Sequence, residues 1–275
     1  MTKDNPMKVF SFGGGVQSMA VLVLSAQGKL PYTHFIFANV GDDSENPDTL
    51  SYMENVVWPY AVKHHLQMVV VKRSRKSHQS QTLLQHIWEA NGDIPIPVFF
   101  PGRLPGSRNC TSQWKIKVIE KWMRDQAGAT KETRIPIGIG ISVDESHRMR
   151  TDDPEREPYL IKEYPLIELM MTRAMCQDII HKAGLPIPPK SACWFCPYKL
   201  RSDWANLRTK HPILWTRAVE IEEYINDKRK NAGKGPVYIT SFDTPIESAI
   251  PLLPMNMFDD DNDDSMTCES GYCMT

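Results

Sequence analysis

Three consecutive glycines near the beginning of the chain constrain its fold more than any other stretch. They occupy positions 13–15, after a short apolar run at residues 9–12 and before a segment, residues 16–26, that we expect to be a helix. Glycine adopts positive φ without steric cost and lets the backbone approach a ligand closely. The helix would direct its N-terminal N–H groups and the positive end of its dipole at the loop. The stretch therefore predicts a buried strand, an anion-binding loop and a helix; the alternative is a plain strand-to-helix turn.

This glycine loop, residues 13–15, matches neither of the two commonest nucleotide-binding loops. A P-loop ends in Gly-Lys-Ser/Thr, and a Rossmann loop needs G-x-G-x-x-G; the sequence Gly-Gly-Gly-Val-Gln-Ser supplies neither. Polar side chains nevertheless flank the glycines. The candidate phosphate-binding residues are Ser11, Gly13, Gly14, Gly15, Gln17 and Ser18. We expect that a side chain introduced at Gly14 would occupy phosphate space.

The same stretch resembles the pyrophosphate loop, S-G-G-x-D-S, of the adenine-nucleotide α-hydrolase superfamily, which includes the ATP pyrophosphatases and the phosphoadenosine-phosphosulfate (PAPS) reductases. Gln17 stands where the pyrophosphatase form has aspartate, and it is closer to the F-G-x-Q version of the PAPS reductases. The resemblance implies that an adenine nucleotide, ATP or PAPS, is bound through its phosphates.

Strands and helices alternate through the first half of the chain. Apolar runs predict buried strands at residues 34–38, 67–71 and 135–141, and apolar faces predict helices at 50–61, 82–90 and 116–123. This order predicts an α/β fold in which a parallel sheet has helices on both faces, as the resemblance also implies. In such sheets, ligands bind beyond the C-terminal ends of the strands.

The second half of the chain has a different character. Helices are expected at residues 172–183, 202–209 and 212–232, and the proline-rich stretch 184–191 cannot be helical. We therefore expect a C-terminal helical and loop appendage on the sheet. The predicted parts are a nucleotide-binding α/β core at 1–163, a helical, cysteine-bearing appendage at 164–257, and a flexible, acidic, cysteine-containing tail at 258–275.

Bulk properties limit the function classes. A net charge of −1 gives no global basic field for nucleic acid. The sequence has no apolar run of roughly 18 residues and no apolar signal region at its N-terminus, so we expect a cytoplasmic protein without a membrane partner. In a reducing compartment, six cysteines favour metal ligation or redox chemistry over structural disulfides. The oligomeric state is not predicted.

Three further stretches resemble family loops. Residues 39–49 are similar to D-T-G-x-x-x-P-E-T, with Asn39 in place of aspartate, and residues 140–148 are similar to G-x-x-x-D-E-S-x-x-R. Residues 108–115 are similar to R-x-C-x-x-x-x-K. The resemblance implies contacts to the nucleotide, including forked arginine donors to phosphate or sulfate. The candidate residues are Asn39, Gly41, Lys115, Gly140, Glu145, Ser146 and Arg148, with Arg150 as the alternative to Arg148.

Cys193-Trp194-Phe195-Cys196-Pro197 is the sharpest metal signal, because a C-x-x-C turn can direct two sulfurs at one ion or cluster. Cys176 and Cys110 lie upstream, and the segment as a whole is similar to the cysteine region of phage and bacterial PAPS-reductase-like proteins. Four thiolates would hold a [4Fe–4S] cluster or a structural zinc ion; free thiols are the third alternative.

Cys268 and Cys273 lie in the predicted tail. In PAPS reductases the nucleophilic cysteine lies on a C-terminal tail that folds over the nucleotide, so by placement these two are the candidate catalytic residues. The alternative is a disordered tail whose cysteines have no role.

Three functions are consistent with these features. The first is a PAPS reductase-like enzyme that performs thiol-based sulfur chemistry, with a thioredoxin-like reductant as partner. The second is an ATP-dependent, adenylating sulfurtransferase whose thiolation substrate is a nucleic acid. The third is a non-catalytic nucleotide-sensing or interaction module, which the substitutions at Gln17 and Asn39 favour.

Overall fold

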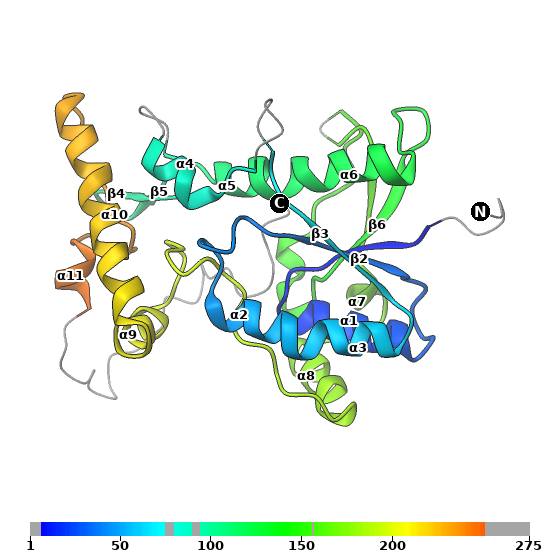
Figure 1. Ribbon diagram of the computed structural model, residues 1–275. Helices are drawn as coiled ribbons and strands as arrows, with labels where there is room; N and C mark the ends of the chain where they lie inside the picture. Colours follow the sequence, from blue (N-terminus) through cyan, green and yellow to red (C-terminus); the bar gives the residue numbers. More distant parts are fainter. Residues whose placement is uncertain (1–6, 75–79, 90–93, 156, 251–275) are drawn as a thin grey trace.

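The centre of the protein is an all-parallel sheet of five strands in the order β3-β2-β1-β6-β7, as the computed structural model shows (Figure 1). The structure describes residues 7–74, 80–89, 94–155 and 157–250. The strands are β1 (Val9–Ser11), β2 (His34–Ala38), β3 (Gln67–Val71), β6 (Ile135–Ile139) and β7 (Leu160–Glu163). The predicted α/β fold is confirmed; β7 is a strand that the sequence analysis did not predict.

The strand order places a topological switch point at β1. Phe10 in β1 pairs with Phe35 in β2 on one side and with Gly138 in β6 on the other. The chain therefore first extends the sheet in one direction, through β2 and β3, and later in the other, through β6 and β7. Ligands of open parallel sheets bind in the crevice that such a reversal leaves at the C-terminal strand ends.

Helices cover both faces of the sheet, because alternate strand residues point to opposite sides. Phe10 and Phe35 pack in one core with residues of α1 (Val16–Ala26), α3 (Trp58–Lys63) and α8 (Arg173–Lys182). Val9 and Ile36 pack in a second core with residues of α6 (Lys117–Ala127). Figure 1 shows α6 on one side of the sheet and α1, α3 and α8 on the other, which confirms the predicted layers.

A third core lies beyond the sheet. It joins α9 (Arg201–Lys210), α10 (Pro212–Asn231) and α11 (Ile246–Ala249) with α4 (Leu83–Glu89), Trp114 and Trp194. The short hairpin of β4 (Phe99–Phe100) and β5 (Leu104–Pro105) pairs through Phe99 with Tyr238, which lies next to core residues Val237 and Ile239. These cores cross the predicted boundary at residue 164, since α4 packs with the later helices and α8 packs on α1.

Two helical stretches contain a π-helical turn. Residues 47–63 run as α2 (Pro47–Tyr52), a π turn (Met53–Val57) and α3, and residues 109–127 run as α5 (Asn109–Thr111), a π turn (Ser112–Ile116) and α6. In the first stretch the wider turn precedes Pro59, whose ring and missing N–H disturb a regular α-helical ladder. In the second it carries Lys115, a predicted site residue. Single π turns are frequent at functional sites.

Two short elements complete the described chain, the 3₁₀ turn η3 (Val143–Arg148) and α7 (Pro165–Glu168). Among the described residues, no helix is both long enough and apolar enough to cross a bilayer. The predicted tail, with Cys268 and Cys273, lies outside the described residues.

Candidate functional site

The candidate site lies at the C-terminal edge of the sheet, where loops leave β1, β2 and β6. The glycine loop follows β1, residues 39–46 follow β2, and residues 140–148 follow β6. Ser11 ends β1 and is buried, and Gly15 is the N-cap residue of α1 without a side chain to cap it. The open first turn of α1 therefore begins at the glycine loop, as the sequence predicts, and its N–H groups are available to an anion.

Both the backbone conformation and the neighbouring side chains favour glycine at position 14. Its φ is +80°, a left-handed conformation that side chains disfavour. A Cβ added there would lie 3.2 Å from Oγ of Ser191 and 3.2 Å from Cγ2 of Thr49. The expectation that a side chain at this position would occupy phosphate space is therefore wrong, because that direction is filled by the protein itself. Ser191 in turn donates a hydrogen bond to the carbonyl of Gly13.

The side chains of Gln17 and Ser18, in the first turn of α1, form hydrogen bonds within the protein. The Nε2 of Gln17 donates to Oγ of Ser142 at 3.3 Å, and its Oε1 accepts from Arg173 at 3.2 Å. Ser18 donates to the carbonyl of Gly15 at 2.9 Å. Gln17 thus joins the loop after β1 to the loop after β6 and to α8. A contact between these two side chains and a nucleotide stays a prediction.

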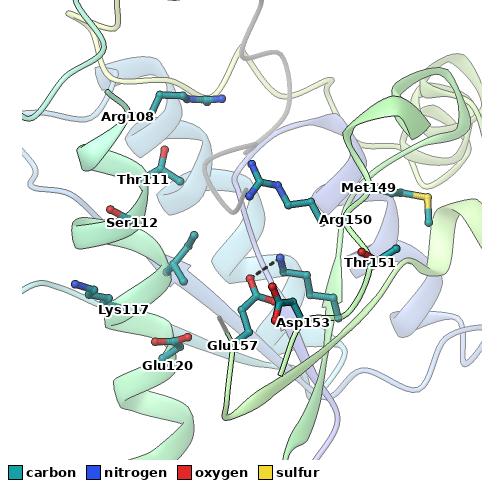
Figure 2. Close-up of a pocket in the computed structure, with 12 residues that line it drawn as sticks. Arg108, Thr111, Ser112, Lys117, Glu120, Met149, Arg150, Thr151, Asp153 and Glu157 are labelled. Atoms are coloured by element: carbon teal, nitrogen blue, oxygen red, sulfur yellow. Dashed lines mark ion pairs between the residues drawn. The ribbon is translucent and has the colours of Figure 1, made fainter. Parts of the chain in front are cut away.

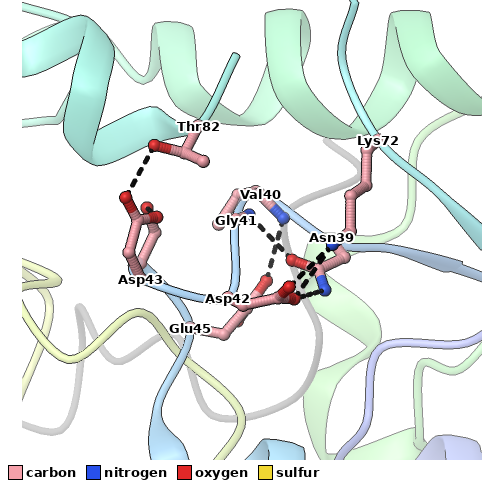
Figure 3. A network of polar contacts seen from close by, with 9 residues as sticks. Asn39, Val40, Gly41, Asp42, Asp43, Glu45, Lys72 and Thr82 are labelled. Carbon is pink, nitrogen blue, oxygen red and sulfur yellow. Dashed lines mark hydrogen bonds and ion pairs between the residues drawn. The ribbon is translucent and has the colours of Figure 1, made fainter. Parts of the chain in front are cut away.

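The loop after β2 is held by a network that begins at Asn39 (Figure 3). Its Oδ1 accepts from the N–H of Gly41 at 2.7 Å, and its Nδ2 donates to Asp42 at 2.7 Å. Lys72 lies 2.9 Å from the other oxygen of Asp42, and these two donors lower the pKa of that carboxyl. The side chain of Glu45 accepts from the N–H of Val40. Asn39 therefore shapes the loop from within.

The loop after β6 approaches α1 closely. A Cβ at Gly140 would lie 3.3 Å from the ring of Phe10 and 3.5 Å from the backbone nitrogen of Ser18. A side chain there would press on the Phe10 ring and otherwise make ordinary contacts, so the loop and α1 are already closely packed. Further along, the buried Glu145 forms an ion pair with Arg148 at 3.1 Å, whereas Ser146 is exposed.

The two candidate arginines differ in environment. Both side chains of the Arg148–Glu145 pair are mostly buried, at 15% and 10% exposure. Arg150 is exposed and lines a separate pocket on the α6 side. Arg148 thus has a carboxylate partner inside its own loop, and Arg150 is the more accessible of the two.

Residues 191–194 connect the cysteine segment to this edge of the sheet. Ser191 contacts the glycine loop, and Cys193 forms an isolated bridge with Glu45. Trp194 donates its backbone N–H to the carbonyl of Ser44 at 3.3 Å and its Nε1–H to the carbonyl of Asp43 at 2.7 Å. The C-x-x-C turn therefore lies beside the glycine loop, although about 180 residues separate them in sequence.

Three of the four predicted thiol ligands share one neighbourhood. Burial, most of all, raises the pKa of the Cys193 thiol; Glu45, Cys196 and Cys110 raise it further, and Lys115 opposes them. Cys110, Cys193 and Cys196 are each half-buried. Lys115 thus acts electrostatically on the Cys193 thiol, and its contact with a nucleotide stays a prediction.

Cys176 lies elsewhere. It is fully buried on α8 in the core below the sheet, and burial raises the pKa of its thiol to about 12, with a smaller contribution from Asp144. In the described part of the chain, no three or more His, Cys, Asp or Glu side chains are arranged to hold a metal ion. Cys176 thus belongs to a different core from Cys110 and Cys193, and a [4Fe–4S] cluster or zinc ion held by the four thiolates stays a prediction.

Lys199 is a residue of this neighbourhood that sequence reasoning missed. Its side chain is nine-tenths buried, and burial lowers the pKa of its ammonium, while Asp203, Cys196 and Cys193 act in the opposite direction. Its ammonium forms no hydrogen bond or ion pair with residues that the structure describes. A lysine three residues after C-x-x-C carries no signal in a single sequence, because only the turn at Pro197 folds it back toward the thiols.

Comparison with known proteins adds no family to this geometry: no protein-family model matches the chain, and no curated protein is significantly similar to it.

Proposed function

We propose that this protein is a PAPS reductase-like enzyme that binds an adenine nucleotide by its phosphates at the glycine loop and carries out sulfur chemistry with the neighbouring thiols. The proposal rests first on the position of the loop. It occupies the switch point of a parallel sheet, and the helix that follows leaves its first N–H groups without a side-chain cap.

One observation carries the proposal. Ser191 is hydrogen-bonded to Gly13, and Cys193 follows two residues later against the loop after β2. A group bound at the glycine loop would therefore lie near a dithiol. This is the arrangement that transfer of sulfur from a nucleotide requires, since the reacting atoms must meet at the phosphate end.

The chemistry that fits is nucleophilic attack by a thiolate on the sulfur of an activated sulfate. A sulfur–sulfur bond forms, the bond from sulfur to the phosphate oxygen breaks, and the nucleotide leaves. A second thiol then attacks the cysteine sulfur and releases sulfite, which leaves a disulfide for an external, thioredoxin-like dithiol to reduce. In the proposed reaction Cys193 and Cys196, both free thiols, supply the pair, and the tail residues Cys268 and Cys273 stay candidate nucleophiles.

Lysine side chains near the thiols support a role for Cys193 and Cys196 as thiolate nucleophiles. Thiolates are the reactive species, and burial acts against them at Cys193. Lys115 opposes the effect of burial on the pKa of Cys193. Lys199 interacts electrostatically with both Cys193 and Cys196. In the proposed enzyme they stabilise the thiolate, and Lys115 thereby acts on the thiols as well as on an incoming anion.

The test combines binding with turnover. Titration calorimetry with PAPS and with ATP should give saturable binding of at least one nucleotide, and the protein with PAPS and a dithiol should release sulfite. Cys193→Ser should abolish sulfite release while nucleotide affinity changes less than twofold. The matched control, Cys176→Ser, should retain both, because Cys176 lies in a separate core.

Failure to bind either nucleotide would overturn the proposal, as would full sulfite release by a variant in which Cys193, Cys268 and Cys273 are all replaced by serine. Full release by Cys193→Ser alone would assign the nucleophile to the tail. Binding without turnover would instead support the non-catalytic, nucleotide-sensing module.

A second candidate is the adenylating sulfurtransferase that acts on nucleic acid. The observation in its favour is that three thiols gather beside the loop, one more than a dithiol exchange needs. It predicts that ATP, rather than PAPS, binds and that pyrophosphate is released only when a nucleic-acid acceptor is present.

A further inference from the structure

A large pocket lies on the α6 side of the sheet, apart from the glycine loop. It has a volume of about 820 Å³ and separates the helical stretch 109–127 from residues 149–162 (Figure 2). A cavity of this size accommodates a nucleotide-sized ligand. Its helical wall is the stretch that also carries Cys110 and Lys115, but neither of these two residues lines the pocket.

The charges of the pocket favour an anion. Lys162 is neutralised by Glu157, 2.6 Å away, and both side chains are mostly buried. Burial, and then the nearby Glu157, raise the pKa of the Glu120 carboxyl. Four cationic side chains line the pocket against three carboxylates, those of Glu120, Asp153 and Glu157, so the lining has one net positive charge. Lys117 and Arg150 remain on opposite walls, and their charged groups form no hydrogen bond or ion pair with the described residues.

Two arginine side chains, Arg108 and Arg150, extend toward the pocket from its two walls. Figure 2 shows Arg150 extending from the 149–162 wall into the pocket and Arg108 extending from the helical wall above Thr111. Arg108 is held with its guanidinium 4.8 Å from the centre of the Tyr198 ring. Planar guanidinium groups that converge in this way suit the oxygens of a phosphate or sulfate.

Thr111 supplies an independent sign of a ligand. Its side chain lines the pocket and is only 2% exposed, and its Oγ1 has no hydrogen-bond partner among the described residues. A buried hydroxyl without a partner is rare in folded proteins and destabilises them. An oxyanion in the pocket would accept the hydrogen bond that Thr111 leaves unmade.

We propose that this pocket binds the phosphate or sulfate group of a substrate, with Arg150, Arg108 and the hydroxyl of Thr111 as its ligands. The site is distinct from the glycine loop and does not depend on a nucleotide there. Since Thr111 follows Cys110, an anion bound here lies next to the helix turn that carries one of the three gathered thiols.

The experiment measures binding of inorganic phosphate and inorganic sulfate to the full chain by thermal shift and calorimetry, at constant ionic strength set with sodium chloride. The wild type should be stabilised by one or both anions in a saturable manner. Arg150→Gln should weaken the affinity at least tenfold. Lys121→Gln is the matched control: Lys121 lies on α6 outside the pocket, paired with Asp125, and its loss should change the affinity less than twofold.

Thr111→Val separates a ligand from an ordinary packing role. Valine has nearly the same shape but no hydroxyl, so the variant should melt at a higher temperature than the wild type without phosphate and gain less from phosphate. A variant that loses stability and keeps the full phosphate effect would overturn the role of Thr111.

Two further measurements show whether phosphate stabilises the protein from the pocket, from the glycine loop or through ionic strength alone. If the effect survives Arg150→Gln but is lost when an adenine nucleotide saturates the glycine loop, the anion binds at that loop and the pocket proposal is overturned. An equal shift with chloride would overturn it as well. Failure of nucleotide binding, by contrast, leaves the phosphate measurements unaffected and bears on the proposed function alone.

Discussion

At the residue scale, Gly14 shows how one position depends on two separate constraints. Its positive φ disfavours any side chain, and the space that a Cβ would enter is lined by Ser191 and Thr49. Gly28 offers a comparison, because it has a similar φ of +70° but nothing within 4 Å of its added Cβ.

Gly14→Ala should therefore lower the free energy of unfolding by about 2–3 kcal/mol, and Gly28→Ala by about 1 kcal/mol. The difference between them isolates the crowding against Ser191 and Thr49, which is absent at Gly28. Urea unfolding of both variants measures it. Equal losses would show that the neighbours of Gly14 move aside without cost.

At the scale of an element, the C-x-x-C turn is positioned by Trp194. Its indole is almost fully buried and its Nε1–H donates to Asp43 in the loop after β2. Trp204 on α9 is equally buried, but its Nε1 has no hydrogen-bond partner among the described residues. The two tryptophans therefore differ chiefly in that one bond.

Trp194→Phe should destabilise the protein by about 1 kcal/mol more than Trp204→Phe, because only the first change removes a hydrogen bond, the one to the carbonyl of Asp43. It should also increase the rate at which a thiol reagent labels Cys193, whereas Trp204→Phe should not. Chemical denaturation and mass-resolved labelling test the two expectations. Unchanged labelling in Trp194→Phe would mean that the turn is held by its other contacts.

At the scale of the whole molecule, polar contacts from residues 191–194 join the sheet to the third core. Ser191 reaches the glycine loop, and Cys193 and Trp194 reach the loop after β2. These contacts make the candidate site a joint property of two cores.

Ser191→Ala should speed amide hydrogen exchange roughly five- to tenfold both in the glycine loop and in residues 191–196, since one buried hydrogen bond between them is lost. Ser25→Ala is the control, because Ser25 donates only to Val21 within α1. Exchange that changes on one side alone would show that the two segments open independently.

Local patterns in the sequence determined much of this protein. Alternating apolar runs and helical faces predicted β2, β3, β6 and the helices α8, α9 and α10, and the glycines predicted the loop at the end of β1. Such features depend on residues a few positions apart, through side-chain periodicity and backbone freedom. Because the strands are parallel, the loops after β1, β2 and β6 lie at the same edge of the sheet, where ligands of such sheets bind.

Contacts between distant segments were decided only by the tertiary structure. Four cysteines look equivalent in the sequence, yet Cys176 faces the core below the sheet while Cys110 joins the C-x-x-C turn. Arg148 and Arg150, two residues apart, end in different surroundings, one paired with a buried carboxylate and the other open to a pocket. Spacing along a chain sets which way a side chain leaves its own element. What it meets depends on how helices pack across the sheet, and that is set by the fit of whole apolar faces rather than by any local motif.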